Sequence, residues 1–214
     1  MTTATGLDNR VALPPFLPSG RGEDTFFGVA ARKCISDLLV GFIPFALLHA
    51  PKYQRAYEPP GEPFRISDLA MVVLAACPRQ PGASVEEGLR SLGEYLLEYT
   101  RVDYSEFRSR LLCSIRKSIA AMIKACKLCL LEFHSSPGKW AREMRRWIEQ
   151  LESRMERVNA GRTESLLFPS LGDVAVQRFL HGYGDALQQW IEIVATSVRL
   201  RAKECRLGVL LNGK

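Results

Sequence analysis

Cys126 and Cys129 are spaced as a C-x-x-C pair, the arrangement that serves disulfide exchange and zinc binding. A redox pair needs a strand leading into the motif, and a zinc site needs two further ligands at a standard spacing. Here the pair lies within a helical pattern, and neither Cys113 nor His134 has a spacing that completes a site. We therefore expect core cysteines, with a metal or redox pair as the alternative, and we predict no metal site and no cofactor.

The other groups that could catalyse a reaction are scattered along the chain. There are three histidines, His49, His134 and His181, and no serine or cysteine lies in a recognisable nucleophile elbow. The segment 181–185 contains two glycines and is typical of a turn or a kinked helix; without a preceding strand it is not a phosphate-binding loop. We predict no catalytic residue, and therefore a protein that is not an enzyme.

Basic residues form the most regular pattern in the sequence. Arg110, Lys117 and Lys124 are seven residues apart, which places them on one side of a helix over about 21 Å. This stripe is long enough to follow several phosphates or a patch of anionic headgroups. The predicted binding residues for an anionic partner are this stripe, its flanks and the basic residues of the next helix: Arg108, Arg110, Arg116, Lys117, Lys124, Lys127, Lys139, Arg142, Arg145 and Arg146.

The distribution of charge supports this prediction. The chain has a net charge of +6, and residues 101–163 alone carry 14 Lys and Arg against 7 Asp and Glu. Such a concentration favours an acidic protein, an anionic membrane surface or nucleic acid as the partner. The sequence thus predicts a non-enzymatic interaction or structural protein. Nucleic-acid binding is the alternative function, although no zinc-finger spacing or base-stacking strand is present, and a merely solvated helix face is the alternative to any partner.

A stripe of large apolar residues accompanies the second basic helix. Trp140, Trp147 and Leu151 follow near-heptad steps. This spacing is typical of a helix face buried in the core, and also of a coiled-coil seam between two chains. We predict that these three residues contribute to self-association into a homo-oligomer, with burial inside the chain as the alternative.

A short segment at 85–96 suggests one further alternative. Its apolar residues recur on one side of a helix and are Val85, Leu89, Leu92 and Leu96. With its Leu-Arg pair and its Gly93-Glu94 pair, the segment resembles the BH3 helix of the Bcl-2 family, and the tripeptide at 140–142 is similar to that family's Trp-Gly-Arg. The resemblance implies a helical regulator of apoptosis with a peptide-binding groove. The residues after 142 depart from the family, because they are charged where the family has an apolar central helix.

The compartment is predicted from the cysteines and from the apolar runs. The first ten residues have no apolar signal region, and six cysteines without such a signal indicate reduced thiols. The longest apolar run, 38–48, is interrupted by Gly41 and Pro44 and is shorter than the roughly 20 residues that a spanning helix needs. We expect an intracellular protein, cytoplasmic or nuclear, without a transmembrane segment.

The elements that must position these groups are helices. Helical patterns or capping residues begin near Asp24, Ser67, Ser84, Asp103, Ser136 and Asp173. We expect the first helix to run to Pro44, a loop at 51–64, and a last helix that extends to the C-terminus and is weakened near Gly182 and Gly184. No segment alternates in the manner of a strand. The predicted fold is therefore all-α: a single-domain antiparallel bundle of about five to six helices over 23–214, preceded by a flexible Pro/Gly-containing arm at 1–22.

Overall fold

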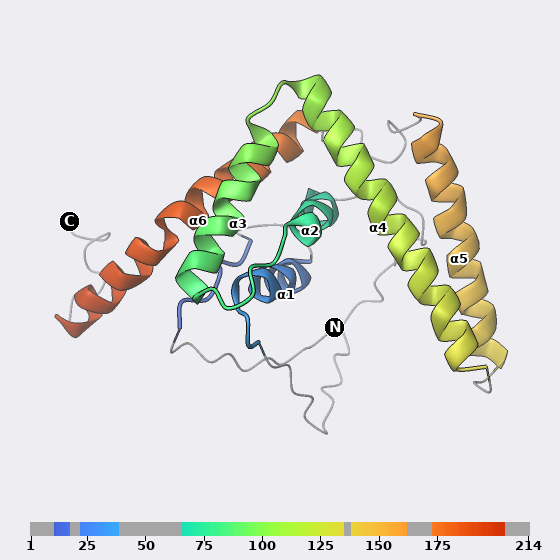
Figure 1. Ribbon diagram of the computed structural model, residues 1–214, viewed down its shortest axis with the longest axis horizontal. Helices are drawn as coiled ribbons and strands as arrows, with labels where there is room; N and C mark the ends of the chain where they lie inside the picture. The colour runs from blue at the N-terminus through green and yellow to red at the C-terminus, as the bar shows by residue number, and fades with distance from the viewer. Residues whose placement is uncertain (1–10, 18–21, 39–65, 135–137, 162–172, 204–214) are drawn as a thin grey trace, which may run out of the picture.

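The computed structural model describes residues 11–17, 22–38, 66–134, 138–161 and 173–203. Within these ranges every regular element is an α-helix, and no strand is present (Figure 1). The helices are α1 (Glu23–Cys34), α2 (Ile66–Ala76), α3 (Val85–Thr100), α4 (Tyr104–Glu132), α5 (Gly138–Asn159) and α6 (Asp173–Ala202). The predicted all-α class is confirmed.

Two predicted N-terminal caps set the starts of α3 and α4. The Ser84 hydroxyl accepts a hydrogen bond from the Glu87 amide at 3.2 Å, and the Ser84 amide donates to the Glu87 carboxylate at 2.7 Å. These hydrogen bonds hold the pKa of Glu87 below its ordinary value. At α4, the Asp103 carboxylate accepts from the Glu106 amide at 3.0 Å. Each cap satisfies backbone donors that the first helical turn leaves unpaired, so both helices begin where the sequence predicts.

The first helix ends ten residues earlier than predicted. α1 stops at Cys34 and Ile35 is extended, so Pro44 does not end this helix. The Arg79 guanidinium donates to the carbonyl oxygens of Ile35 and Ser36, which holds the chain in its new direction. The apolar run that continues the helical pattern past residue 38, the predicted loop at 51–64 and the predicted cap at 136 lie outside the described residues.

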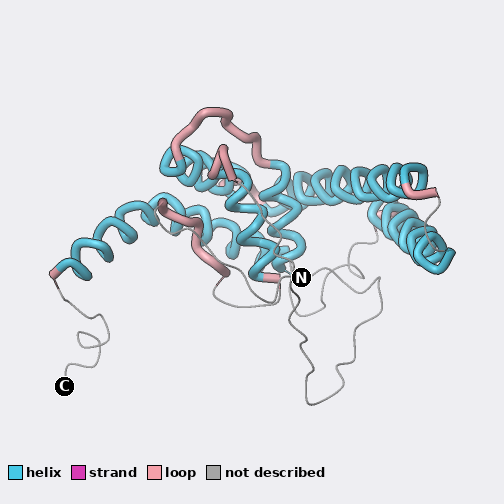
Figure 2. The backbone as a smooth tube through the Cα atoms, turned by 90° about the horizontal axis from the view of Figure 1, so that it is seen from below, coloured by secondary structure: helices cyan, strands magenta, loops and turns pink. Residues whose placement is uncertain are grey.

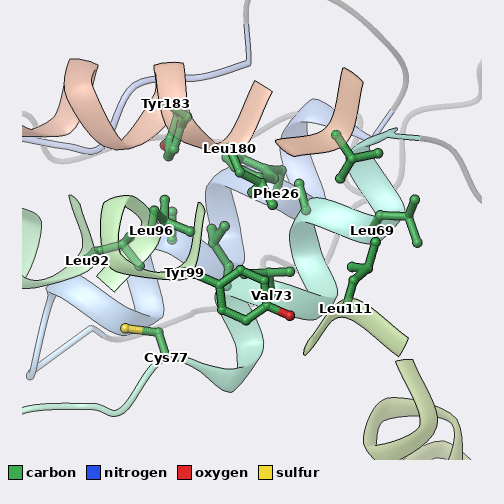
Figure 3. Packing of buried hydrophobic residues seen from close by; sticks show 14 of the residues in the cluster. Phe26, Leu69, Val73, Cys77, Leu92, Leu96, Tyr99, Leu111, Leu180 and Tyr183 are labelled. Atoms are coloured by element: carbon green, nitrogen blue, oxygen red, sulfur yellow. The ribbon is translucent and has the colours of Figure 1, made fainter. Parts of the chain in front are cut away.

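α3 and α6 form the centre of the core. Phe26 of α1 and Val73 of α2 are fully buried between them, together with Leu96 and Leu180 (Figure 3). The two long helices cross closely at Gly93 and Gly184: a Cβ on Gly184 would lie 3.1 Å from the Gly93 carbonyl oxygen. α6 runs unbroken through Gly182 and Gly184, where the sequence predicts a turn or a kink. At Gly184, glycine is needed for helix packing rather than for a turn.

Part of the predicted N-terminal arm packs on this core. Residues 11–17 have no regular secondary structure, but Leu17 is buried. The indole of Trp190 donates to the Leu13 carbonyl at 2.6 Å, and the Tyr183 hydroxyl donates to the Pro15 carbonyl at 2.9 Å. These bonds attach the segment to α6.

α4 and α5 form a helical hairpin that projects from the core (Figures 1 and 2). The N-terminal half of α4 packs on α2, whereas its C-terminal half lies beside α5 only, among the described residues. Contacts pair the two helices in opposite directions, from Arg116 with Val158 at the base to Phe133 with Trp140 at the tip. α5 packs against α4 and against no other described helix.

Candidate docking site on the helical hairpin

The buried side of α4 determines where its basic side chains point. Its fully packed residues are Phe107, Leu111, Ile115 and Ile119. Lys117 is two residues from both Ile115 and Ile119, which places it about 160° around the helix from each of them. Lys124 is seven residues from Lys117 and lies on the same side. Both lysines are exposed, so the predicted stripe faces solvent along the hairpin.

Eight of the ten predicted binding residues fall into two groups. Three of them form ion pairs within their own or the neighbouring helix: Arg110 with Glu106 at 2.6 Å, Lys127 with Glu152 at 2.8 Å and Arg146 with Glu143 at 3.2 Å. Five exposed residues form no ion pair with another described residue, and these are Lys117, Lys124, Lys139, Arg142 and Arg145. The side chains of the second group are available to a partner. The ion pairs of the first group are exposed, so they contribute little to stability and exchange readily for contacts with a partner.

The arginines near the base of the hairpin have a structural role. Arg116, one of the predicted binding residues, donates to the Val158 carbonyl at 3.3 Å and so ties α4 to the end of α5. Arg108 is half-buried. Burial, and then the neighbouring Arg157 charge, lower the pKa of Arg154, while Asp68 of α2 opposes this shift. Arg108 and Arg154 are half-buried and therefore less accessible to a partner, whereas Arg116 is exposed.

The predicted self-association stripe packs inside the chain. Leu151 is 2% exposed and Trp147 is half-buried, and both contact the core cluster through α4. The Trp140 ring packs edge-on against Phe133, with 6.3 Å between ring centroids. A second chain that used Leu151 would have to open the hairpin first. Self-association through these residues stays a prediction.

The basic residues of α4 and α5 lie on different sides of the hairpin. Leu151 marks the side of α5 that faces α4. Arg142 is nine residues from Leu151, or about 180° around the helix, and Arg145 is about 120° away. These arginines therefore point away from α4, while Lys117 and Lys124 follow the solvent side of α4. The free charges surround the hairpin rather than forming one flat patch.

The tip of the hairpin carries an apolar surface that the sequence did not predict. Leu131 is 72% exposed, Leu128 54% and Phe133 50%. An open groove of about 390 Å³ lies along this end, and its lining residues are Ala120, Ile123, Lys124, Lys127, Leu128, Leu131 and Met155. Exposed leucines at adjacent turns are unusual on a polar helix surface. The sequence does contain a signal for this surface. Leu128, Leu130 and Leu131 are so close together that they cannot all lie on the one side of α4 that α5 covers.

The thiols and histidines provide no assembled catalytic or metal centre in the described part of the chain. Cys126 and Cys129 are free and half-buried on α4, and Cys113 is free and exposed. Among the described residues, no three His, Cys, Asp or Glu side chains are grouped so that they could hold a metal ion.

One polar row was missed by the sequence prediction. His181 Nδ1 lies 3.0 Å from the Thr100 hydroxyl, and its Nε2 lies 3.5 Å from the Asp185 carboxylate. The order of groups resembles a nucleophile, base and acid. However, Thr100 is buried and its hydroxyl donates to the Leu96 carbonyl at 2.8 Å. This row therefore closes the C-terminal turn of α3 against α6 rather than presenting a nucleophile.

The BH3-like segment contributes to the core. Leu89, Leu92 and Leu96 are each at most 1% exposed, and Gly93 contacts the α6 backbone. The same apolar face that would enter a partner's groove thus packs inside this chain, and presenting it would require α3 to leave the core.

None of the helices in the described part of the chain combines the length and the apolar character needed to cross a membrane. Comparisons of the chain with protein-family models, curated proteins and solved structures found no match. The hairpin is therefore the part of the molecule that points to a function.

Proposed function

We propose that this protein is a non-enzymatic interaction protein that docks an anionic partner through the α4–α5 hairpin. One observation supports this proposal above the others. Five exposed basic side chains of the hairpin form no ion pair with a described residue, although Glu side chains are available on the same two helices. Uncompensated charge on a projecting element raises the rate and the affinity of binding to an anionic surface.

The shape of the hairpin supports the same function. Because α5 packs on no described helix other than α4, most of the hairpin surface is free of contacts with the other described helices. A partner can therefore approach Lys117, Lys124 or Arg142 without displacing another described helix. The core helices bear far less positive charge, since α1, α2, α3 and α6 together carry 6 Lys and Arg against 10 Asp and Glu.

A charge-reversal pair tests the proposal. The hairpin variant is Lys117→Glu with Lys124→Glu; the matched control is Arg90→Glu with Arg178→Glu, two exposed residues of α3 and α6. Both variants change the net charge equally. Binding is measured at low and rising salt to phosphatidylserine-containing vesicles, to polyglutamate and to duplex DNA.

We expect wild type and control to bind at least one probe with a salt-dependent affinity, and the hairpin variant to lose roughly tenfold or more. Equal losses in the two variants would mean that only net charge matters. Absence of binding to every probe at low salt would also contradict the proposal.

A further inference from the structure

The tip of the hairpin combines free basic side chains with exposed apolar ones. Between residues 124 and 146 the chain has six Lys and Arg against two Asp and Glu. The exposed apolar residues Leu128, Leu131 and Phe133 lie within this range. Basic charge alone would suit any anionic partner, but it does not explain why leucine side chains are exposed to water. The two features together are typical of elements that bind at a lipid interface.

The apolar side chains lie on opposite sides of the tip. Leu131 is in the last turn of α4, and Phe133 is the C-cap residue two positions later, which separates them by about 160° around the helix axis; the Phe133 ring packs against Trp140 of α5. Leu128 is on the side of Leu131. A folded protein partner would cover one side and leave the other in water, whereas a bilayer surrounds an inserted tip on all sides. The placement therefore favours a lipid interface over an acidic protein.

The basic residues of the two helices lie at different depths from the tip. Lys124 is seven residues before Leu131, which is about 10 Å along α4. Arg145 lies near the level of Leu131, because Phe133 contacts Trp140 and Lys127 contacts Glu152 across the hairpin. Amphipathic elements enter the boundary between headgroups and acyl chains by roughly 5–10 Å. When the leucines reach that boundary, Lys124 is level with the lipid phosphates, and the long Arg142 and Arg145 side chains can extend back to them.

We propose that the tip of the α4–α5 hairpin inserts into the surface of an anionic bilayer. Leu128, Leu131 and Phe133 enter the acyl boundary, and Lys124 and Arg145 contact the phosphate groups. This inference rests on the proposed docking function and names its partner. A second copy of the chain suits the tip less well, because two tips with a six-to-two excess of basic residues repel each other.

The test uses the full chain and vesicles of phosphatidylcholine with or without phosphatidylserine. The tip variant is Leu128→Gln with Leu131→Gln; its matched control is Ile193→Gln with Val198→Gln, two exposed apolar residues of α6. We expect wild type and control to bind only the anionic vesicles. The tip variant should bind them at least about tenfold more weakly, because two leucine side chains no longer leave water.

Insertion itself is read from tryptophan fluorescence. Lipids brominated in the acyl chain should quench the fluorescence of the wild-type protein, and Trp140→Phe should remove most of that quenching. Trp147 and Trp190 lie away from the tip, so quenching that persists in this variant would place the lipid contact elsewhere and overturn the inference.

The remaining outcomes separate this inference from the proposed function. If the tip variant binds anionic vesicles as wild type does while Lys117→Glu with Lys124→Glu fails, docking is electrostatic only and tip insertion is wrong. Binding to polyglutamate or DNA without binding to vesicles would also overturn the membrane partner, yet leave anionic docking intact. No binding to any of these probes would contradict both proposals.

Discussion

α3 and α5 bury very different shares of their surfaces. In α3, eight of 16 residues are buried, among them two glycines that admit neighbouring backbones. In α5, three of 22 residues are buried, and α4 is the one helix of the described part of the chain on which it packs. The core helices are thus fixed from several sides, while the hairpin is held together along one seam. This difference leaves most of the hairpin surface available for binding without weakening the core.

The same substitution, leucine to glutamine, should change the free energy of unfolding strongly in the core and very little at the tip of the hairpin. Leu92 is 1% exposed in the core, whereas Leu131 at the tip is mostly exposed. Leu92→Gln should lower the free energy of unfolding by about 4 kcal/mol, because it removes buried apolar area and leaves a buried amide unpaired. Leu131→Gln should change it by less than about 0.5 kcal/mol. Denaturant unfolding followed by circular dichroism measures both changes. Similar losses of unfolding free energy in the two variants would contradict the predicted difference between core and tip.

Opening the seam should affect the hairpin more than the core. Leu151→Ala removes a buried side chain between α5 and α4 and should cost about 3 kcal/mol of local stability. Hydrogen exchange should quicken in α5 and in the distal half of α4 while α3 and α6 keep their protection. Ser153→Ala, at an exposed position of the same helix, is the control. Equal acceleration in α3 would show that hairpin and core unfold together.

Two glycine-to-alanine substitutions in the core helices should change the free energy of unfolding in opposite directions. A Cβ on Gly88 would collide with the backbone of Cys34 in α1, whereas a Cβ on Gly182 would meet nothing within 4 Å. Gly88→Ala should therefore lower the free energy of unfolding by about 2 kcal/mol, because α1 and α3 must separate. Gly182→Ala should raise it by up to about 1 kcal/mol through helix propensity. Stabilisation by both substitutions would mean that α1 and α3 are not in close contact.

The thiols of the core and of the hairpin should differ in their chemical reactivity. Burial raises the pKa of Cys34 to about 12 and that of Cys77 to about 11, from an ordinary value of 9.0. The unfolded chain therefore loses these protons first, and stability should fall as the pH rises above 9. At pH 9, iodoacetamide should modify the exposed Cys113 of α4 quickly and spare the two core thiols. Mass mapping checks the order, and rapid modification of Cys34 in the folded chain would contradict it.

The helix starts were predictable because capping is local. Ser84 with Glu87 and Asp103 with Glu106 are each three residues apart, and the structure places both caps where the sequence indicates. The end of α1 was not predictable in the same way. Its apolar pattern continues past Cys34, and the helix stops where Arg79, more than forty residues away, donates hydrogen bonds to the carbonyl oxygens of Ile35 and Ser36. Such long-range contacts leave no periodic signal.

The candidate site was predictable in its charge but not in its geometry. The seven-residue spacing of Lys117 and Lys124 places both on the solvent side of α4. The sequence could not show that Leu128 and Leu131 stay mostly exposed beside α5, because that depends on which side of α4 the second helix covers. Nor could it show that Leu151 and Trp147 pack inside the chain. Both facts depend on tertiary packing, which overrides local pattern.

Lysine footprinting on phosphatidylserine-containing vesicles shows directly whether the chain docks through the α4–α5 hairpin. The unmodified chain is acetylated briefly with and without vesicles, and each lysine is quantified by mass spectrometry. Lys117, Lys124 and Lys139 of the hairpin should become protected by vesicles, while the exposed Lys203 at the end of α6 should react at an unchanged rate. Protection of Lys203 with unchanged reactivity of the three hairpin lysines would contradict docking through the hairpin.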